Sequence, residues 1–234
     1  MKKIIFATQN QGKVKEIKKI LEGMPVEVLT MDEAGIDIEI EENGKTFEEN
    51  AVIKAEALKV YTDAIILADD SGLEIDCLNK EPGVYSARYL GKDTPYEVKN
   101  QIILDRLKDV EQENRTARFV CAIAAAGKDM ETMTTLGTIE GYIGHEARGA
   151  NGFGYDPIFY VEGTSISTAE LTPDEKNAIS HRAKALNAMK EKLKEIESKI
   201  EEIENKTIQE KAEYYEKKES ISKKINDMLL RKNE

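Results

Sequence analysis

Ala64-Ile65-Ile66-Leu67-Ala68-Asp69-Asp70-Ser71-Gly72 joins a short apolar run to two adjacent carboxylates. An apolar run of this length is typical of a buried strand, so we expect a strand over residues 64–68. Two carboxylates at the end of such a strand repel each other unless a cation or a proton lies between them. Acidic pairs on loops are usually only solvated, but this position favours a functional site.

Strands and helices alternate on both sides of this stretch. Upstream, the pattern predicts strands over 4–8 and 26–29, a helix that begins at Gly12, and a helix from Thr46 through Tyr61 that starts with the capping box Thr46-x-x-Glu49. Downstream, it predicts a helix over 95–107, paired strands over 117–126 and 133–139, and a short strand over 158–161. This alternation indicates an α/β fold with a mixed, elongated central sheet flanked by helices.

From Thr172-Pro173-x-Glu175 onward, the chain is nearly all helical in pattern. A heptad seam advances by alternating steps of three and four through Leu186, Met189, Leu193, Ile196, Ile200 and Ile203. The seam loses phase at Asn205-Lys206-Thr207, where Thr207-x-x-Glu210 offers a new capping box. A second set of apolar residues follows: Ile208, Ala212, Tyr215, Ile221, Ile225 and Leu229. We therefore expect a C-terminal helical hairpin of residues 184–204 and 208–230, and a division of the chain into domains 1–196 and 197–234.

Thr8-Gln9-Asn10-Gln11-Gly12-Lys13 is a polar turn between a predicted strand and a predicted helix. Backbone N–H groups at a helix start lack partners within the helix, and the helix dipole attracts anions. Gly12 permits close approach of a ligand, and Lys13 adds a positive charge. The hexapeptide is a candidate phosphate cradle, although an ordinary capped turn has the same composition. Gly44-Lys45-Thr46 is not a P-loop, because Glu39 occupies the place of the required first glycine.

A second acidic pair, Glu41-Glu42, lies in the loop before Thr46. Magnesium takes oxygen ligands, usually one or two protein carboxylates together with water and substrate phosphates. The two acidic pairs therefore suit a magnesium site. For Glu41-Glu42 alone, a solvated loop is an equally good explanation.

The loop Gly149-Ala150-Asn151-Gly152-Phe153-Gly154-Tyr155-Asp156-Pro157 surrounds an aromatic ring and a carboxylate with glycines. An aromatic ring on a pliant loop can stack on a base, and a turn with Phe153 in the core is the alternative. Lys176 and Ser180-His181-Arg182 add three possible cations or donors. A lone histidine is more often structural than catalytic, and His145, which has no such neighbours, is expected to be structural.

Composition limits the partners of this protein. The 234-residue chain has a formal net charge of −11, whereas general nucleic-acid binding needs a basic surface. Cys77 and Cys121 form no Cys-x-x-Cys motif, so we expect core residues in a reducing, cytoplasmic setting rather than a disulfide framework or a zinc site. The apolar run near the start is too short for a signal peptide, and no stretch reaches membrane-spanning length.

Six motifs, in this order along the chain, resemble those of the Ham1/RdgB family of inosine/xanthosine triphosphate pyrophosphatases: Thr8-x-Asn10-x-x-Lys13-x-x-Glu16, Thr46-Phe47-x-Glu49-Asn50-Ala51, Ala68-Asp69-Asp70-Ser71-Gly72-Leu73, Pro82-Gly83-Val84-Tyr85-Ser86-Ala87-Arg88, Gly152-Phe153-Gly154-Tyr155-Asp156-Pro157 and Ser180-His181-Arg182. The resemblance extends over residues 1–196. It implies an α/β fold with two lobes around a nucleotide cleft, a homodimer and magnesium dependence. The activity it implies is hydrolysis of ITP, dITP and XTP to the monophosphate and pyrophosphate, which removes deaminated purines from the nucleotide pool.

The same resemblance implies roles for particular residues. Thr8, Gln9, Asn10, Gln11, Gly12 and Lys13 would contact the triphosphate, and Lys13 would also assist catalysis. Glu41 and Asp70 would bind magnesium, and Asp70 would also be the base for the attacking water. Ser71 would touch the substrate. Phe153 would stack on the purine, beside Gly154 and Tyr155, and the purine edge would be read by Asp156, Lys176, His181 and Arg182.

The implied chemistry is coherent. Water attacks the α-phosphorus, magnesium and Lys13 neutralise charge on the phosphoryl oxygens, and pyrophosphate leaves. Arg182 offers only donors, so it suits a 6-keto oxygen and opposes the 6-amino group of adenine. GTP also has a 6-keto group, so its exclusion depends on the shape of the pocket around its 2-amino group.

Two other functions fit parts of the sequence. A Maf-like pyrophosphatase acting on modified pyrimidine nucleotides shares the sheet architecture and the acidic metal site, but the Phe153 and His181 motifs disfavour it. A nucleotide-responsive scaffold would give the tail the main role, but Lys13, Asp70 and Lys176 are not needed for that. The chain departs from the family pattern at Ala183, where glycine is common, and in its tail, which suits self-association, a helical partner, or packing on its own domain.

Overall fold

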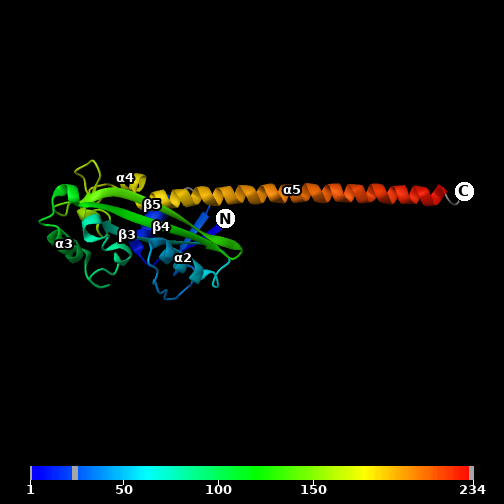
Figure 1. Cartoon of the computed structure of the whole chain (residues 1–234). Coiled ribbons are helices and arrows are strands. Elements are labelled where there is room, and N and C mark those ends of the chain that lie inside the picture. The colour runs from blue at the N-terminus through cyan, green and yellow to red at the C-terminus, as the bar shows by residue number, and fades with distance from the viewer. Residues whose placement is uncertain (1, 23–25, 232–234) are drawn as a thin grey trace. The chain divides into compact units, whose positions relative to one another are not determined.

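The computed structural model describes residues 2–22 and 26–231 and divides the chain into two compact units, Met1–Met189 and Lys190–Glu234. Six strands form a single sheet in the order β2-β1-β3-β4-β5-β6 (Figure 1). Their bounds are β1 Lys2–Phe6, β2 Val26–Thr30, β3 Ile65–Ile75, β4 Thr116–Gly127, β5 Met130–Ile143 and β6 Phe159–Val161. Strands β2, β1 and β3 run parallel, whereas β3 through β6 pair antiparallel. The predicted mixed α/β fold is confirmed.

In the described residues, five α-helices accompany the sheet: α1 Gln11–Ile20, α2 Phe47–Leu58, α3 Tyr96–Arg106, α4 Pro173–Ile179 and α5 His181–Arg231. The predicted start of α2 is confirmed, because the Thr46 side chain accepts a hydrogen bond from the backbone N–H of Glu49. No described helix combines the length and the apolar character needed to cross a membrane.

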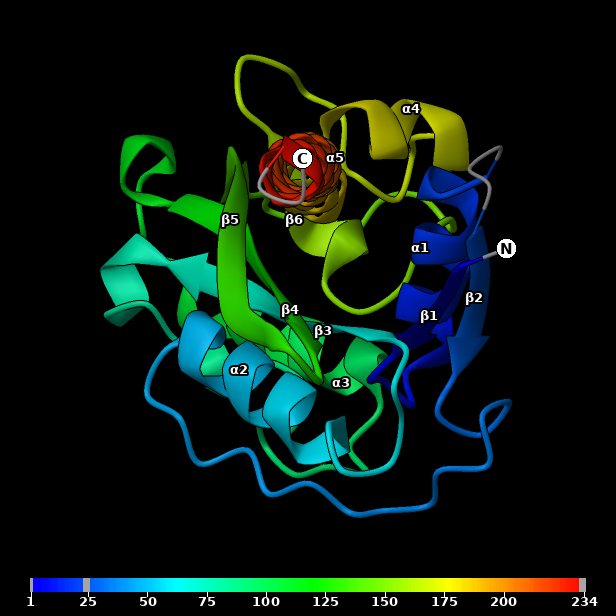
Figure 2. The same ribbon diagram turned by 90° about the vertical axis from the view of Figure 1, so that its right-hand side faces the viewer.

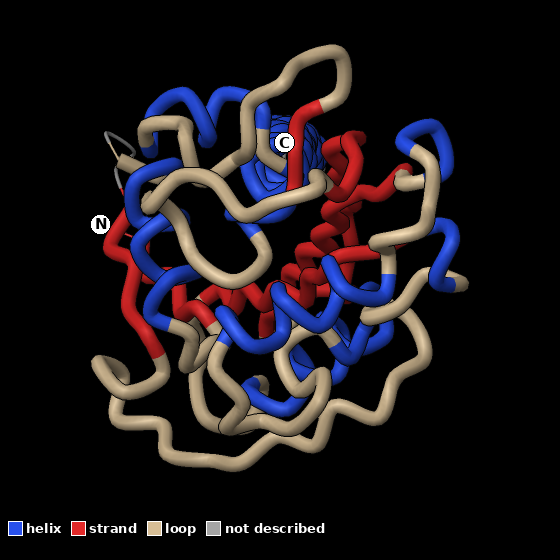
Figure 3. The backbone as a smooth tube through the Cα atoms, turned by 90° about the vertical axis from the view of Figure 1, so that its left-hand side faces the viewer, coloured by secondary structure: helices blue, strands red, loops and turns tan. Residues whose placement is uncertain are grey.

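Helices pack on both faces of the sheet. In Figure 2, α2 lies on the opposite side of β3 and β4 from α1 and α4, and Figure 3 shows the strands as one curved layer between helices. One core cluster joins Ala51, Ala55 and Leu58 of α2 to β3 and β4. A second cluster, around Leu73, Phe119 and Ile103, joins the far end of the sheet to α3. These two cores correspond to the two expected lobes.

Strand β3 is longer than predicted. The sequence suggested a strand that ends at Ala68, but β3 continues to Ile75, and Asp69 and Asp70 lie in its middle, opposite Ile123 and Ala122 of β4. Successive side chains of a strand point to opposite faces, so the two carboxylates do not face each other. Each is neutralised on its own side of the sheet, and this is why the strand tolerates the pair.

Gly137 allows the start of α5 to lie directly on β5. A Cβ atom at this position would lie 2.5 Å from the backbone nitrogen of Ala185 and closer still to the carbonyl oxygen of His181. No side chain can move aside to relieve this contact, because both neighbours are backbone atoms. The glycine therefore sets where His181 and Arg182 enter the domain.

The predicted helical hairpin is wrong, because α5 runs without interruption from His181 to Arg231. The chain has neither proline nor glycine near residue 205 to end a helix. Thr207 does not cap a new helix; its hydroxyl instead donates to the carbonyl of Ile203, one turn back in the same helix. The side chains of Ile225 and Leu229 lie outside the described residues.

Candidate functional site

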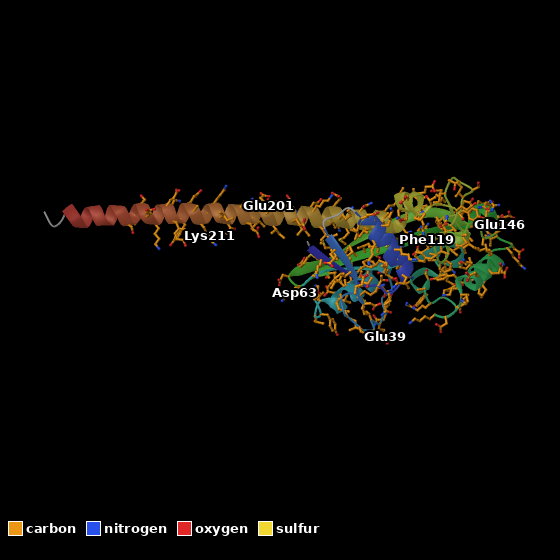
Figure 4. The ribbon with its side chains drawn as sticks, turned by 180° about the vertical axis from the view of Figure 1, so that it is seen from behind. Glu39, Asp63, Phe119, Glu146, Glu201 and Lys211 are labelled. Atoms are coloured by element: carbon orange, nitrogen blue, oxygen red, sulfur yellow. The ribbon has the colours of Figure 1, made fainter. Side chains whose placement is uncertain are left out.

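A cavity of about 490 Å³ lies at the end of β1 and along β3, within the first unit. Its lining includes Phe119 and Glu39, which are labelled in Figure 4. The structure brings together thirteen of the predicted site residues in its wall: Thr8, Gln9, Asn10, Lys13, Asp70, Ser71, Phe153, Gly154, Tyr155, Asp156, Lys176, His181 and Arg182. Gln11, Gly12 and Glu41 are not among the lining residues.

The polar turn before α1 is capped by one of its own side chains, that of Asn10. The Asn10 side chain accepts hydrogen bonds from the N–H groups of Gly12 at 2.9 Å and Lys13 at 3.2 Å. These two donors were expected to be free for a phosphate, and in this structure they are satisfied by the cap. Thr8, Gln9 and the ammonium group of Lys13 remain on the cavity side of the turn.

Asp69 faces α1 and the start of α5. Its Oδ2 lies 3.1 Å from Nζ of Lys13 and 3.4 Å from the guanidinium of Arg182. Burial by itself raises the pKa of Asp69, but the charges of Lys13 and Arg182 outweigh burial and hold that pKa well below its usual value. Asp69 is therefore a permanent anion that positions two cations at the cavity wall.

Asp70 faces α2, on the other side of β3. Its carboxylate accepts a hydrogen bond from the Asn50 side chain at 3.0 Å and lies 3.4 Å from Nζ of Lys54. Burial raises the pKa of Asp70, although Lys54 and Lys13 oppose the shift. A buried carboxylate with a raised pKa accepts a proton more readily than a solvated one does.

Glu42, and not the predicted Glu41, lies beside Asp70. Nζ of Lys54 is 3.2 Å from Glu42 and 3.4 Å from Asp70, so one ammonium group joins the two carboxylates. Both carboxylates line the cavity, whereas Glu41 is exposed on its loop. Magnesium prefers carboxylate oxygens as ligands, and the carboxylates of Asp70 and Glu42 already share one cation, so the pair fits a magnesium ion. The geometry favours Glu42 over Glu41 as the second ligand.

The glycine-rich loop is held from inside by Asp156. The Asp156 carboxylate accepts hydrogen bonds from the N–H of Phe153 at 2.8 Å and the hydroxyl of Thr168 at 2.8 Å. The Phe153 ring lies against α1, because a Cβ atom on Gly12 would come within 2.8 Å of it. A side chain at position 12 would therefore require the Phe153 ring to shift.

Glu16 connects the two cations that flank Phe153. It forms ion pairs with Lys176, at 2.8 Å, and with Arg182. Nζ of Lys176 lies 5.1 Å from the centre of the Phe153 ring, and the Arg182 guanidinium lies 5.9 Å from it. Lys176 also bonds Asp156 at 2.6 Å. The cations, the ring and α1 therefore form one connected wall.

His181 is buried and uncharged. Its ring stacks on Phe119 with centroids 5.0 Å apart, and among the described residues its Nδ1 has no hydrogen-bond partner. Burial, reinforced by the charges of Arg182 and Lys176, lowers the pKa of His181 well below its usual value. The His181 ring lines the cavity, but its Nδ1 atom is itself buried.

Sequence reasoning did not assign roles to Asn50, Lys54 or Glu16, and it considered Glu42 only as part of the acidic pair Glu41-Glu42. A signal for the first two was present, since Asn50 and Lys54 are four residues apart and so share one face of α2. That face also carries Ala51 and Ala55, and polar residues among buried alanines indicate a buried polar partner. The partner, Asp70, is distant in sequence and could not be identified without the fold.

Comparison with known proteins places this chain among well-described relatives. A family model described as the Ham1 family matches residues 4–192. A dITP/XTP pyrophosphatase of Bacillus subtilis (strain 168) is 52% identical over 189 residues, covering 81% of this chain and 96% of the relative. The corresponding protein of Thermoanaerobacter pseudethanolicus is 50% identical, covering 80% of this chain and 94% of the relative. A solved HAM1 protein from Coxiella burnetii matches with a TM-score of 0.75 and 43% identity over 83% of this chain and all of that one.

Proposed function

Because the chain belongs to the Ham1 family, we propose that it is a magnesium-dependent enzyme that hydrolyses ITP, dITP and XTP to the monophosphate and pyrophosphate. The observation that carries this proposal is the position of Asp70, a buried carboxylate that lies next to Lys54 and lines the same cavity as Lys13. Relatives named as dITP/XTP pyrophosphatases support the substrate class.

The phosphate end of the substrate lies at the turn before α1. Thr8, Gln9, Asn10 and Lys13 line this part of the cavity, and Gln11 and Gly12 complete the turn. Lys13 and Lys54 supply positive charge for the phosphoryl oxygens, while Ser71 offers a hydroxyl on the strand. Pyrophosphate is a good leaving group once its negative charge is balanced in this way.

Asp70 takes the proton from the attacking water. Asn50 and Lys54 hold its carboxylate in place, and burial makes it more basic. Asp70 and Glu42 would hold a magnesium ion, which when bound neutralises charge on the phosphoryl oxygens. Since both residues are fixed by the same ammonium group, Lys54 acts as the positioning residue for the pair.

The purine lies against Phe153 and meets the wall formed by Lys176, His181 and Arg182. Lys176 and Arg182 carry only donors, which suit a 6-keto oxygen and oppose an adenine amino group. Tyr155 and Gly154 support the ring, because Tyr155 donates to the carbonyl of Ser86 at 2.8 Å and Asn100 donates to that of Gly154 at 3.1 Å. GTP is rejected through the shape of the cavity wall near the 2-amino group of guanine.

The proposal extends to assembly and location. Domain 1–196 is proposed to form a homodimer in the cytoplasm. The unpaired thiols of Cys77 and Cys121 support a reducing compartment. Sedimentation of residues 1–196 with and without nucleotide tests the assembly of this domain apart from the tail, and a truncated protein that stays a monomer at all concentrations would contradict it.

Substrate choice tests the central assignment. We expect magnesium-dependent release of pyrophosphate from ITP and XTP, with much lower kcat/KM for GTP, ATP and a modified pyrimidine triphosphate. Preference for the pyrimidine would support a Maf-like enzyme, and binding of nucleotide without turnover would support a scaffold.

The metal ligands are tested by a matched pair of variants. Glu42→Gln should raise the magnesium concentration needed for half-maximal turnover, whereas Glu41→Gln should leave it near that of the unchanged protein. If Glu41→Gln raised this magnesium concentration and Glu42→Gln did not, Glu41 would be the ligand.

A further inference from the structure

Helix α5 continues through the second unit as an exposed helix. Every described side chain from residue 197 through residue 222 is exposed. Several are large and apolar, among them Ile200, Ile203, Tyr214 and Ile221. Figure 4 shows side chains such as Glu201 and Lys211 projecting from this part of the helix. Helices in water are stabilised mainly by packing of an apolar face, so this segment needs a partner.

Ile200, Ile203, Tyr214 and Ile221 follow a heptad repeat, whereas Ile208 and Tyr215, which are also exposed, lie at b positions outside it. With Leu193 at position a, the next a positions are Ile200, Thr207, Tyr214 and Ile221, and the first d positions are Ile196 and Ile203. The later d positions, Glu210 and Lys217, are charged, so the seam is strongest in its first half. Thr207 fits a seam because its hydroxyl bonds Ile203 in the same helix and needs no acceptor from a partner.

The charges beside the seam complement a second copy of the same helix. In a parallel coiled coil, a g residue of one helix faces the e residue five positions later in the other. This rule pairs Lys199 with Glu204 and Glu213 with Lys218, each pair occurring twice by symmetry. Lys206 and Lys211 form a repulsive pair, which likewise occurs twice.

The alignment that satisfies the apolar residues is parallel. In register, Leu193, Ile196, Ile200 and Ile203 each face their own counterparts. An antiparallel overlap of residues 193–217 would instead place Ile200 opposite Glu210 and Leu193 opposite Lys217. The apolar seam and the flanking charges therefore select the same partner and orientation.

We propose that residues 193–222 of α5 form a parallel, in-register coiled coil with the same segment of a second copy of this chain. This interface is separate from the catalytic cavity, all of whose lining residues lie at or before Arg182. It ties two catalytic units together without contributing a residue to the site. Turnover of nucleotide is therefore unchanged by loss of the coiled coil.

Disulfide trapping in the full chain tests the contact. In a Cys77→Ser background, which removes the exposed thiol, Tyr214→Cys places a thiol at an a position, and the matched control Ala212→Cys places one on the outer face at f. Mild oxidation should convert most of the Tyr214→Cys protein to a covalent dimer and leave the control near background. Equal trapping of both variants, or of neither, overturns the proposal, as does an antiparallel pairing, which separates the two 214 positions.

Charge exchange tests the register. Glu213→Lys should slow trapping of the Tyr214→Cys protein several-fold, because residue 213 then faces Lys218 of the other copy. Adding Lys218→Glu should restore the rate. Residues 213 and 218 do not face each other within one helix, so restoration reports contact between copies. An unchanged rate in the single variant, or no restoration in the double, contradicts the proposal.

Discussion

Two neighbouring carboxylates in this protein have different surroundings because a strand alternates its side chains between two faces. Asp69 faces Lys13 and Arg182, and its pKa is lowered. Asp70 faces Asn50 and Lys54, and its pKa is raised by burial. Asp69 therefore holds cations, whereas Asp70 is suited to accept a proton.

Asp70→Asn should abolish nearly all turnover while the fold remains intact. An amide keeps the size of the side chain but cannot accept the proton, so we expect kcat to fall by roughly 10²–10⁴-fold. Steady-state pyrophosphate release and circular dichroism give the two readings. Asp37→Asn, which changes an exposed carboxylate of the same cavity, serves as the control. Near-normal turnover in Asp70→Asn would remove Asp70 as the base.

His181 should lower stability in acid. Its pKa is depressed in the folded state, so between pH 7 and 5.5 the unfolded chain takes up a proton that the folded chain does not. The free energy of unfolding should therefore fall by about 1 kcal/mol over this interval from His181 alone. Urea titrations of the unchanged protein and of His181→Gln isolate the contribution. Identical pH dependence in the two proteins would show that His181 is not buried in the neutral form.

The residues of the site were predictable where they lie together in sequence. One cavity is lined by four residues of the turn before α1 (Thr8, Gln9, Asn10 and Lys13), by the strand residues Asp70 and Ser71, and by the loop residues Phe153–Asp156. Lys54 and Glu16 received no role, because their partners are remote along the chain and their burial depends on which helix faces which strand. That Glu42 and not Glu41 lines the cavity likewise depends on the path of the loop.

At the level of elements, alternating helices and strands predicted the fold well, and the errors came from tertiary contacts. Strand β3 passes through a charged stretch because cations lie on both faces of the sheet. Helix α5 passes through the expected break at Thr207 because nothing in the sequence there ends a helix. A capping-box pattern marks the start of a helix only where the residues before it are not themselves helical.

Gly137→Ala should destabilise the contact between β5 and α5. The added methyl group meets backbone atoms of Ala185 and His181, so strand and helix must separate. We expect a loss of about 1–3 kcal/mol in the free energy of unfolding. Chemical denaturation measures this loss. Gly127→Ala on β4 is the control, because there the methyl group meets only the Met130 side chain at 3.6 Å. Equal stability of the two variants would contradict the close packing.

The whole molecule combines the unit that holds the cavity with a helical extension. The Ham1 family model ends at residue 192, close to the end of the first unit at Met189. The predicted boundary at 196/197 stays a prediction. All lining residues of the cavity belong to the first unit, so the site is complete without the tail.

Truncation after Ile196 should therefore leave kcat and KM for ITP within about twofold of the full chain, a difference of less than 0.5 kcal/mol in the barrier. The shortened protein should at the same time lose tail-dependent association, as measured by sedimentation. A truncated protein that folds but does not turn over would show that the tail contributes to the site.

The most direct measurement is the identity of the products formed from ITP in ¹⁸O-labelled water with magnesium present, with ATP as a parallel substrate. Attack at the α-phosphorus predicts labelled IMP and unlabelled pyrophosphate from ITP, and little product from ATP. Inosine diphosphate with free phosphate, label in the pyrophosphate, or equal use of ATP would contradict the account.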